Sequence, residues 1–437
     1  MALLIYLEKN NARIKYVFDH IFQHILGLDI VFTSDKTSFV NSKGPKINYS
    51  KTAFSNELFF YSSDFLSKQT LNREDLLIDS YNDIKIFFLC NHSALPFDPF
   101  AASFYMLSRY EEYLSQDRDK FGRFRVEDSM AFKNNFLTKP VVDHWIIFIK
   151  EKLLERFPEI SIKEHKFQFI NTIDIDNAYA YLEKGFFRSL AACLRDIFQF
   201  NLKMLTERIR VLFFKNKDPY DTYDKLLRIH NKYNLKTIFF FLLGNYGMYD
   251  RNINFSNVKF KNKIKEISND CDIGIHTSMG SIINREQAMV EIKRLESIIN
   301  QKVILNRQHF LCLNIPYNYQ NFIKHGIKHD YSMGFPTHPG FRAGTSFPFY
   351  FFDMEKNSQT NLLIHPFSIM DVSLNYYLQL NPIDALILIK KIIRRIKQVN
   401  GSFISIWHNE SLNYKNQWTG WDCVYEDMIR FAINEKN

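Results

Sequence analysis

The sequence predicts an α/β protein: a distorted (β/α)7 barrel preceded by an N-terminal α/β accessory domain. Its 437 residues exceed the usual size of one domain, so two are expected. Up to about residue 165, short apolar runs alternate with polar turns, whereas beyond it continuous apolar runs alternate with helical patterns. We therefore expect domains at residues 1–165 and 166–437, with a helical insertion at about 186–222.

In the N-terminal region, Glu57–Tyr61 and Ile84–Cys90 are apolar runs typical of strands. The segment Pro99–Leu114 predicts one helix, with a proline near its first turn and Phe100 and Phe104 on one face.

Seven short apolar runs in the second region are typical of a parallel sheet that is buried on both faces. They are Phe167–Ile173, Thr237–Leu243, Cys271–Ile275, Val303–Leu305, Ile327–His329, Asn361–Ile364 and Ser402–Ile406. Helices are predicted between them, most clearly at Arg285–Ile299 and from the Asn381-Pro382 pair to Asn400-Gly401. Seven β/α units indicate a closed or nearly closed barrel.

Composition and charge limit the classes of molecule that we expect this protein to bind. Apolar residues make up 46% of the chain and charged residues 24%, as in a globular protein with a substantial core. The net charge of +9 is dispersed, without a basic block, zinc finger or helix-turn-helix motif, so we expect no nucleic-acid partner. The charge is compatible with an anionic glycan or a membrane surface.

The five cysteines are scattered and never form a C-x-x-C pair, which predicts reduced thiols and no cysteine-bound zinc. The first residues lack the pattern of a secretory signal, and no run reaches the roughly 18 apolar residues of a membrane span. The expected location is therefore cytoplasmic.

Polar residues of kinds used in catalysis follow six of the seven predicted strands. They are Asp174 and Asp176, His276, Arg307 and His309, Asp330, His365, and His408. Any single one of them could simply cap a helix or contact solvent. The carboxyl ends of barrel strands build the active site, however, so the whole set predicts a metal-friendly catalytic centre.

The run Thr172–Ala180 (TIDIDNAYA) resembles the first motif of the polysaccharide deacetylases of carbohydrate esterase family four. That family consists of metal-dependent N- or O-deacetylases with a barrel fold, and the resemblance covers roughly residues 165–437. The whole chain is similar to a bacterial subgroup with an extra N-terminal domain. The stretches that carry this second similarity are LPFDPFAASFYMLSRYEEYL, NRQHF, DYSMGF, GFRAGT and WHNESL.

The resemblance implies a role for each matching residue. Asp174 corresponds to the catalytic base, and Asp176 to a metal ligand. His276 matches the first ligand histidine of the second motif. Arg307 falls where an arginine holds the base, and His408 matches the histidine that acts as general acid.

One position departs from the family pattern: Gly280 stands where a second ligand histidine is expected. Asp176 and His276 alone are too few ligands for catalytic zinc, which takes three from the protein plus water. We expect His309, at the end of the next strand, to replace the missing ligand; a degenerate site is the other interpretation. Further candidates are His338 and His365. The expected cofactor is a divalent metal, with zinc ahead of cobalt or nickel.

The predicted function is removal of acetyl groups from a sugar or glycan precursor by metal-activated water. Four residues are expected to contact the substrate: Trp407, Asn409, Asp330 and Arg342. Two alternatives remain open. One is a metal-dependent hydrolase of another acylated or phosphorylated sugar, and the other is a degenerate barrel that binds a glycan or partner protein without turnover.

The insertion combines an apolar stripe with basic residues. Phe187, Leu190, Leu194 and Ile197 recur at helical spacing, and Arg or Lys occurs throughout. The segment is either a lid or inter-domain prop with its stripe buried, or an interfacial element that contacts anionic lipid.

Overall fold

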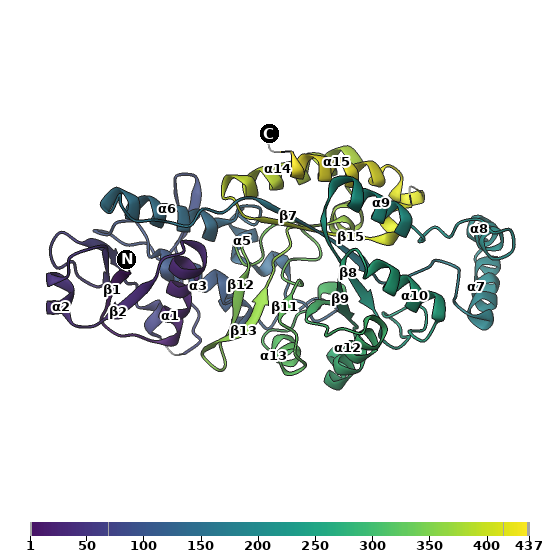
Figure 1. The fold of residues 1–437 in the computed structure, drawn as a ribbon, viewed down its shortest axis with the longest axis horizontal. Helices are drawn as coiled ribbons and strands as arrows, with labels where there is room; N and C mark the ends of the chain where they lie inside the picture. The colour runs from purple at the N-terminus through teal and green to yellow at the C-terminus, as the bar shows by residue number, and fades with distance from the viewer. Residues whose placement is uncertain (1, 69, 414, 435–437) are drawn as a thin grey trace.

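The computed structural model describes residues 2–68, 70–413 and 415–434 of the chain. The protein is an elongated α/β molecule with a smaller sheet near the N-terminus and a larger sheet formed by the rest of the chain (Figure 1). The α/β class predicted from the sequence is confirmed.

The N-terminal sheet is parallel and has the order β2-β1-β3-β4. Its strands are β1 (Leu3–Leu7), β2 (Ile30–Thr33), β3 (Lys46–Ser50) and β4 (Leu58–Tyr61). The predicted strand at Glu57–Tyr61 is thus confirmed. The one at Ile84–Cys90 is shorter than predicted: β6 (Ile84–Ile86) has three residues and, among the described residues, pairs with β5 (Asp79–Tyr81) alone.

Helices pack against this sheet and lead to the larger one. They are α1 (Ala12–Phe18), α2 (Lys36–Asn41), α3 (Pro99–Leu107), α4 (Tyr110–Leu114), α5 (Met130–Lys133) and α6 (Val141–Arg156). The prediction of one helix over residues 99–114 is wrong, because the chain breaks at Arg109, which has φ 55°. The break lets the buried Arg109 guanidinium bind the carboxylates of Glu111 and Glu112.

The larger sheet has the order β12-β13-β11-β10-β9-β8-β7-β15-β14 and is parallel except for β12. Its strands are β7 (Gln168–Ile175), β8 (Lys236–Leu242), β9 (Asp272–Thr277), β10 (Leu305–Gln308), β11 (His329–Asp330), β12 (Phe349–Asp353), β13 (Ser358–Ile364), β14 (Ile369–Met370) and β15 (Ser402–His408). All seven predicted strands coincide or overlap with strands of this sheet, whereas β12 and β14 were not predicted.

The sheet curves without closing by strand pairing: among the described residues, its outermost strands β12 and β14 do not pair. The sequence predicted a closed or nearly closed barrel, whereas the described strands form a curved sheet with two open edges. Met370 in β14 and Tyr331, which follows β11, nevertheless belong to one buried apolar cluster. Because the ladder separates β11 from β14 by five other strands, the sheet must curl around that cluster.

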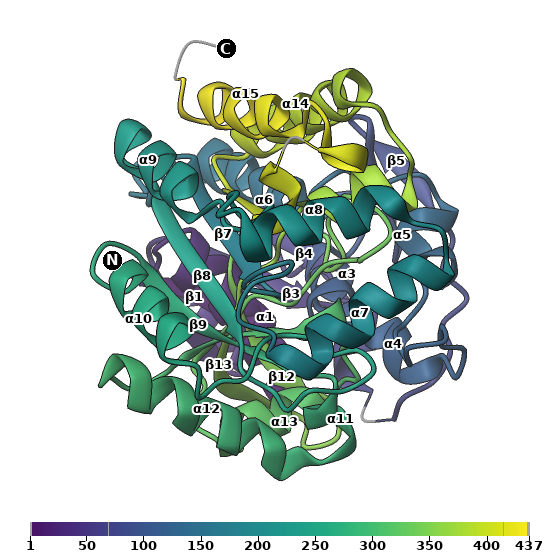
Figure 2. The same ribbon diagram turned by 90° about the vertical axis from the view of Figure 1, so that its right-hand side faces the viewer.

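Helices surround the curved strands (Figure 2). They are α9 (Tyr223–Tyr233), α10 (Val258–Ile267), α11 (Gly280–Ile283), α12 (Arg285–Ile299), α13 (Tyr317–Lys324), α14 (Pro382–Gln398) and α15 (Trp421–Ile433). The predicted helix Arg285–Ile299 is confirmed, as is the cap of α14, where the Asn381 side chain accepts the amide hydrogen of Asp384. Within the described residues, none of the helices is both long and apolar enough for a membrane span.

The N-terminal region packs tightly on the larger sheet. The rings of Tyr16 and Phe104 contact that of Phe352 in β12, at centroid distances of 5.0 and 5.1 Å. A buried ion pair joins Glu112 to Arg342 at 2.6 Å. The two regions therefore share one continuous apolar core.

Candidate active site

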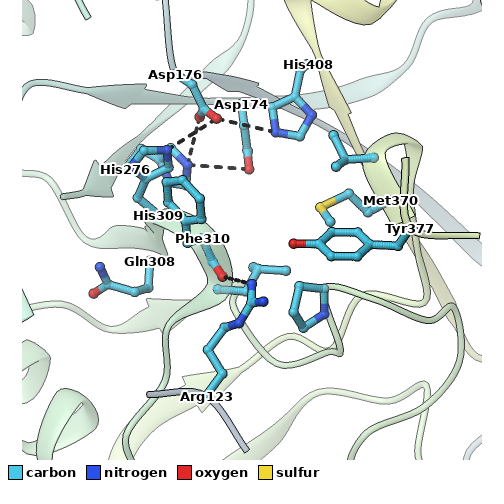
Figure 3. A pocket seen from close by; sticks show the side chains of 13 residues that line it. Arg123, Asp174, Asp176, His276, Gln308, His309, Phe310, Met370, Tyr377 and His408 are labelled. Atoms are coloured by element: carbon cyan, nitrogen blue, oxygen red, sulfur yellow. Dashed lines mark hydrogen bonds and ion pairs between the residues drawn. The ribbon is translucent and has the colours of Figure 1, made fainter. Parts of the chain in front are cut away.

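The carboxyl ends of β7, β9, β10 and β15 meet at a cavity of about 110 Å3 (Figure 3). Its lining consists of Arg123, Asp174, Asp176, His276, Gln308, His309, Phe310, Leu311, Pro336, Met370, Val372, Tyr377 and His408. Five residues predicted to carry the chemistry thus lie around one space, and Arg307 lies directly behind them.

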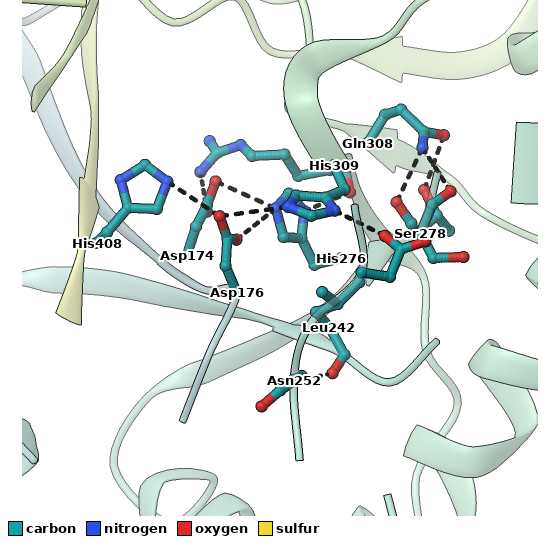
Figure 4. Close-up of polar contacts among 12 residues, drawn as sticks. Asp174, Asp176, Leu242, Asn252, His276, Ser278, Gln308, His309 and His408 are labelled. Atoms are coloured by element: carbon teal, nitrogen blue, oxygen red, sulfur yellow. Dashed lines mark hydrogen bonds and ion pairs between the residues drawn. The ribbon is translucent and has the colours of Figure 1, made fainter. Parts of the chain in front are cut away.

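Three of these residues could hold a metal ion. Ligand atoms of Asp176, His276 and His309 all lie within 4.8 Å of one another. Nε2 of His276 lies 3.0 Å from Oδ1 of Asp176, and Nε2 of His309 lies 3.3 Å from Oδ2 of the same carboxylate (Figure 4). The structure therefore brings together the three residues that the sequence predicted as ligands, although they come from three different β/α units.

In both histidine rings Nδ1 makes a hydrogen bond to the protein, so Nε2 is the nitrogen that faces Asp176. Nδ1 of His276 lies 2.8 Å from the carbonyl oxygen of Arg307, and Nδ1 of His309 lies 2.8 Å from Oδ1 of Asp250. A carbonyl or a carboxylate accepts, so each Nδ1 carries a proton, and Nε2 presents a lone pair toward Asp176 whenever the ring is neutral. This arrangement is typical of metal-binding histidines.

The contact between His276 and Asp176 brings a ring nitrogen close to a carboxylate oxygen. Nε2 of His276 faces Oδ1 of Asp176, a buried oxygen without a hydrogen-bond partner among the described residues. Two such atoms at 3.0 Å repel unless a proton or a metal ion lies between them. The donor set therefore fits a cation.

The site also concentrates charge. Burial by itself would lower the pKa of His309, but Asp176 and Asp250 outweigh it and raise that pKa to about 9. Burial by itself would raise the pKa of Asp176, but His309, with help from His276, holds it well below its usual value. Two carboxylates thus create a field that stabilises positive charge at this point.

Asp250 was not predicted from the sequence. It lies in the loop after β8 and accepts hydrogen bonds from the amides of Met279 and Gly280, at 3.0 and 3.1 Å. A Cβ at position 280 would meet Oγ of Ser278 at 3.3 Å and Oδ2 of Asp250 at 3.8 Å. The tighter of these contacts is with Ser278, while the distance to Asp250, which orients His309, is an ordinary van der Waals contact.

Asp174 is held by Arg307. Nη1 of Arg307 donates to Oδ1 of Asp174 at 2.7 Å and to Oγ1 of Thr172 at 2.7 Å, while Nε donates to the carbonyl of Tyr331. The guanidinium is fully buried and lies over the ring of Phe240. Oδ1 of Asp174 is thus occupied, and Oδ2 lies toward the cavity, 3.8 Å from Nε2 of His276.

His408 is held in the same way by Asp371, a second residue that was not predicted. The two oxygens of Asp371 bind Nδ1 and the backbone amide of His408, each at 2.8 Å. Burial by itself would lower the pKa of His408, but Asp371 and Asp176 together raise it well above its usual value. Nε2 of His408 lies 3.7 Å from Oδ2 of Asp176, at the cavity.

Trp407 and Asn409, which were expected to contact substrate, do not line the cavity. Trp407 is fully buried and packs against Tyr425, with ring centroids 5.0 Å apart. Asn409 donates to the carbonyls of Asn177 and Tyr220 and so connects two loops. The structure gives Trp407 and Asn409 structural roles in place of the expected contact with substrate.

Asp330 and Arg342 also lie outside the cavity lining. Asp330 is buried and accepts hydrogen bonds from Asn306 and Ser332, and Arg342 is bound to Glu112. Both serve packing. The alternative ligand candidates likewise lie elsewhere: His365 stacks on Tyr331, and His338 contacts Thr337.

The N-terminal region contributes Arg123 to the cavity. Its Nη1 donates to the carbonyl of Phe310 at 3.0 Å, and its Nε binds Asp119 at 2.7 Å. Phe310 and Leu311 have φ values of 57° and 53°, a conformation that is costly for side chains of this size. The contact from Arg123 supports this strained turn, which directly follows His309.

Comparisons with known proteins cover the two regions separately. Residues 3–158 match a family of unknown function, DUF7033. No curated protein matches the chain. The family match ends before β7, so every cavity residue except Arg123 lies outside it.

The chain is similar to several solved structures at low identity. One is from Mycobacterium smegmatis and is assigned as a polysaccharide deacetylase: 13% identity, TM-score 0.42, covering 62% of this chain and 86% of that one. A polysaccharide deacetylase from Bacillus cereus has 11% identity and TM-score 0.29, covering 61% and 86%. A CE4 family pseudoenzyme from Bacillus anthracis has 11% identity and TM-score 0.29, covering 61% of each chain.

Proposed function

We propose that the protein is a metal-dependent hydrolase that removes acetyl groups from a sugar or glycan, from nitrogen or from oxygen. The observation that carries the proposal is the group of Asp176, His276 and His309, whose lone pairs converge on one point of the cavity. Asp174 and His408, each held by a buried partner of opposite charge, border the same space.

Asp176, His276 and His309 would hold the metal. One carboxylate and two imidazoles form a ligand set of catalytic zinc sites, so we propose zinc, with cobalt or nickel as alternatives. When bound, a divalent ion supplies Lewis acidity, which polarises an acyl carbonyl and makes a nearby water more acidic.

Asp174 is placed to act as the general base. Its Oδ1 is bound by Arg307, so Oδ2 is the oxygen left to accept the proton of the attacking water. The buried guanidinium also fixes the direction of this carboxylate.

His408 is placed to act as the general acid. Asp371 binds Nδ1, and the proton on Nε2 is therefore the one that can pass to the leaving amine or alkoxide. Asp371 also stabilises the positive charge that His408 carries before it donates.

The size of the cavity favours a small acyl group. Its volume of about 110 Å3 is well below the roughly 300–1,000 Å3 of sites that enclose a drug-sized ligand. An acetyl group and a water fit this space, while the sugar would remain at the mouth. We infer that the N-terminal domain, residues 1–165, contributes to this mouth through Arg123.

Acetate release tests the proposed function. Zinc-loaded protein is incubated with chitin oligosaccharides and with acetylated xylan oligomers, and free acetate is measured enzymatically. We expect release that disappears when a chelator removes the metal and returns when zinc is restored. Zinc-loaded protein that binds these glycans but releases no acetate from either would contradict the proposal and favour a non-catalytic binding protein.

A further inference from the structure

Helices α7 (Phe186–Phe198) and α8 (Leu202–Phe213) form a hairpin, residues 186–214, which projects from the molecule. In Figure 1 it lies at the opposite end from the N-terminal sheet, and in Figure 2 it faces the viewer. The chain enters it from the loop that follows Asp176. The hairpin thus lies at the end of the molecule where β7 delivers its site residues.

The side of the hairpin that faces the protein is mainly polar, although Val211 of α8 is buried as well. Asp196 is the one buried residue of α7, and its ion pair with Arg208 of α8, at 2.8 Å, joins the two helices of the hairpin to each other. Glu207 accepts hydrogen bonds from the Tyr181 hydroxyl at 2.9 Å and from Nζ of Lys415 at 2.7 Å. Ion pairs and hydrogen bonds therefore contribute much of the attachment of the hairpin to the body.

The outward side is apolar, the reverse of an ordinary surface helix. Four phenylalanines are almost fully exposed: Phe187 at 84%, Phe198 at 79%, Phe200 at 87% and Phe213 at 76%. Exposed with them are Phe186, Leu190, Leu194, Ile197, Leu202, Met204, Ile209 and Phe214. Since the stripe is exposed, the interpretation of a lid or prop with a buried stripe is wrong.

The hairpin and the three residues that follow it are strongly positive. Residues 186–217 contain seven basic and two acidic side chains, a net charge of +5. Both acidic side chains are engaged in ion pairs: Asp196 with Arg195 and Arg208 of the hairpin, and Glu207 with Lys415 of the body. Lys203, Arg210, Lys215 and Lys217 are exposed beside the apolar surface.

We propose that the 186–214 hairpin docks on the surface of an anionic lipid bilayer. Its phenylalanines would enter the boundary between headgroups and acyl chains, and the flanking basic side chains would contact the anionic headgroups. A second copy of this chain is a poor occupant of the surface, because two faces of +5 would repel each other. The proposal is independent of the proposed catalytic function.

Binding of the full chain to lipid vesicles tests the role of the basic side chains. Sedimentation with phosphatidylglycerol vesicles at low salt is compared with phosphatidylcholine vesicles, and we expect strong preference for the former. The charge variant carries Arg210→Gln, Lys215→Gln and Lys217→Gln. Each exchange should lower the partition coefficient about fivefold, and the three together about 100-fold. The matched control, Lys265→Gln, Lys293→Gln and Lys391→Gln, removes exposed charges from other helices and should change binding little.

Exposed aromatic residues are tested in parallel. The apolar variant carries Phe187→Ser, Phe200→Ser and Phe213→Ser, and it should lose most binding while remaining folded, because these rings have no buried contacts to lose. Its control is Leu77→Ser, Ile283→Ser and Ile383→Ser, at equally exposed positions elsewhere.

Three outcomes would overturn the proposal. The wild-type chain does not sediment with phosphatidylglycerol vesicles at low salt; or both hairpin variants bind as well as their controls; or sedimentation velocity shows a dimer that the apolar variant dissociates. Anion-dependent binding that both hairpin variants lose, in a monomeric chain, supports it.

Discussion

Replacing His309 with alanine is expected to lower zinc affinity by more than about 100-fold and to abolish acetate release in parallel. Loss of even an outer partner of a zinc ligand costs about 10–100-fold, so loss of one of three ligands should cost more. Competition with a chromophoric chelator measures the affinity. The control is His338→Ala, which removes a histidine that contacts Thr337 and lies outside the site.

A milder substitution distinguishes the loss of a metal ligand from a general loss of folding. Asp250→Asn keeps the size of the side chain that orients His309 but removes its charge, so zinc affinity should fall by about 10–100-fold. Full zinc occupancy in a folded His309→Ala protein that has lost only turnover would show that His309 contacts substrate instead.

Replacing Asp174 with asparagine is expected to lower kcat by about 10²–10⁴-fold while zinc content stays unchanged. The amide cannot accept the proton of the attacking water, whereas the three proposed ligands are untouched. Turnover and bound zinc are measured on the same preparation. The control is Asp143→Asn, because this buried carboxyl, whose pKa burial raises to about 6, binds Thr345 and Ser346 away from the cavity.

The same exchange leaves the buried Arg307 guanidinium without its carboxylate. Removing one partner of a buried ion pair typically costs about 3–5 kcal/mol, so Asp174→Asn should also unfold at lower urea concentration. The assay therefore belongs well below the unfolding transition of the variant. A folded variant that keeps most of its turnover would remove Asp174 from the mechanism.

Sequence patterns located most strands of the larger sheet because continuous apolar runs mark strands that are buried on both faces. Most of the polar residues directly after these runs converge, since parallel strands end at one edge, whereas Asp330 and His365 lie outside the cavity. Asp250 escaped prediction because it lies eight residues beyond the end of β8, in a loop whose path only the fold determines. Asp371 escaped because it follows β14, a strand of two residues without a detectable pattern.

Trp407 could have been assigned correctly from the sequence. Successive side chains of a strand point to opposite faces, so a tryptophan next to His408 must point away from the cavity that His408 faces. Its neighbour Ile406 belongs to the inner apolar cluster, whereas Trp407 packs in the outer core against Tyr425.

The hairpin shows a different limit of what can be predicted from the sequence. Helical spacing from Phe187 to Ile197 predicted an amphipathic helix, which is present as α7, and α8 completes the hairpin. Spacing alone could not decide which side faces solvent, because that depends on Tyr181 and Lys415, distant residues whose side chains bind Glu207.

The most direct test of the metal site is anomalous diffraction at the zinc edge from crystals of zinc-loaded protein. We expect one strong peak about 2.0–2.2 Å from Nε2 of His276, Nε2 of His309 and a carboxylate oxygen of Asp176. A peak bound to other residues, or none at this cavity in protein shown to contain zinc, would contradict the assignment of these three ligands.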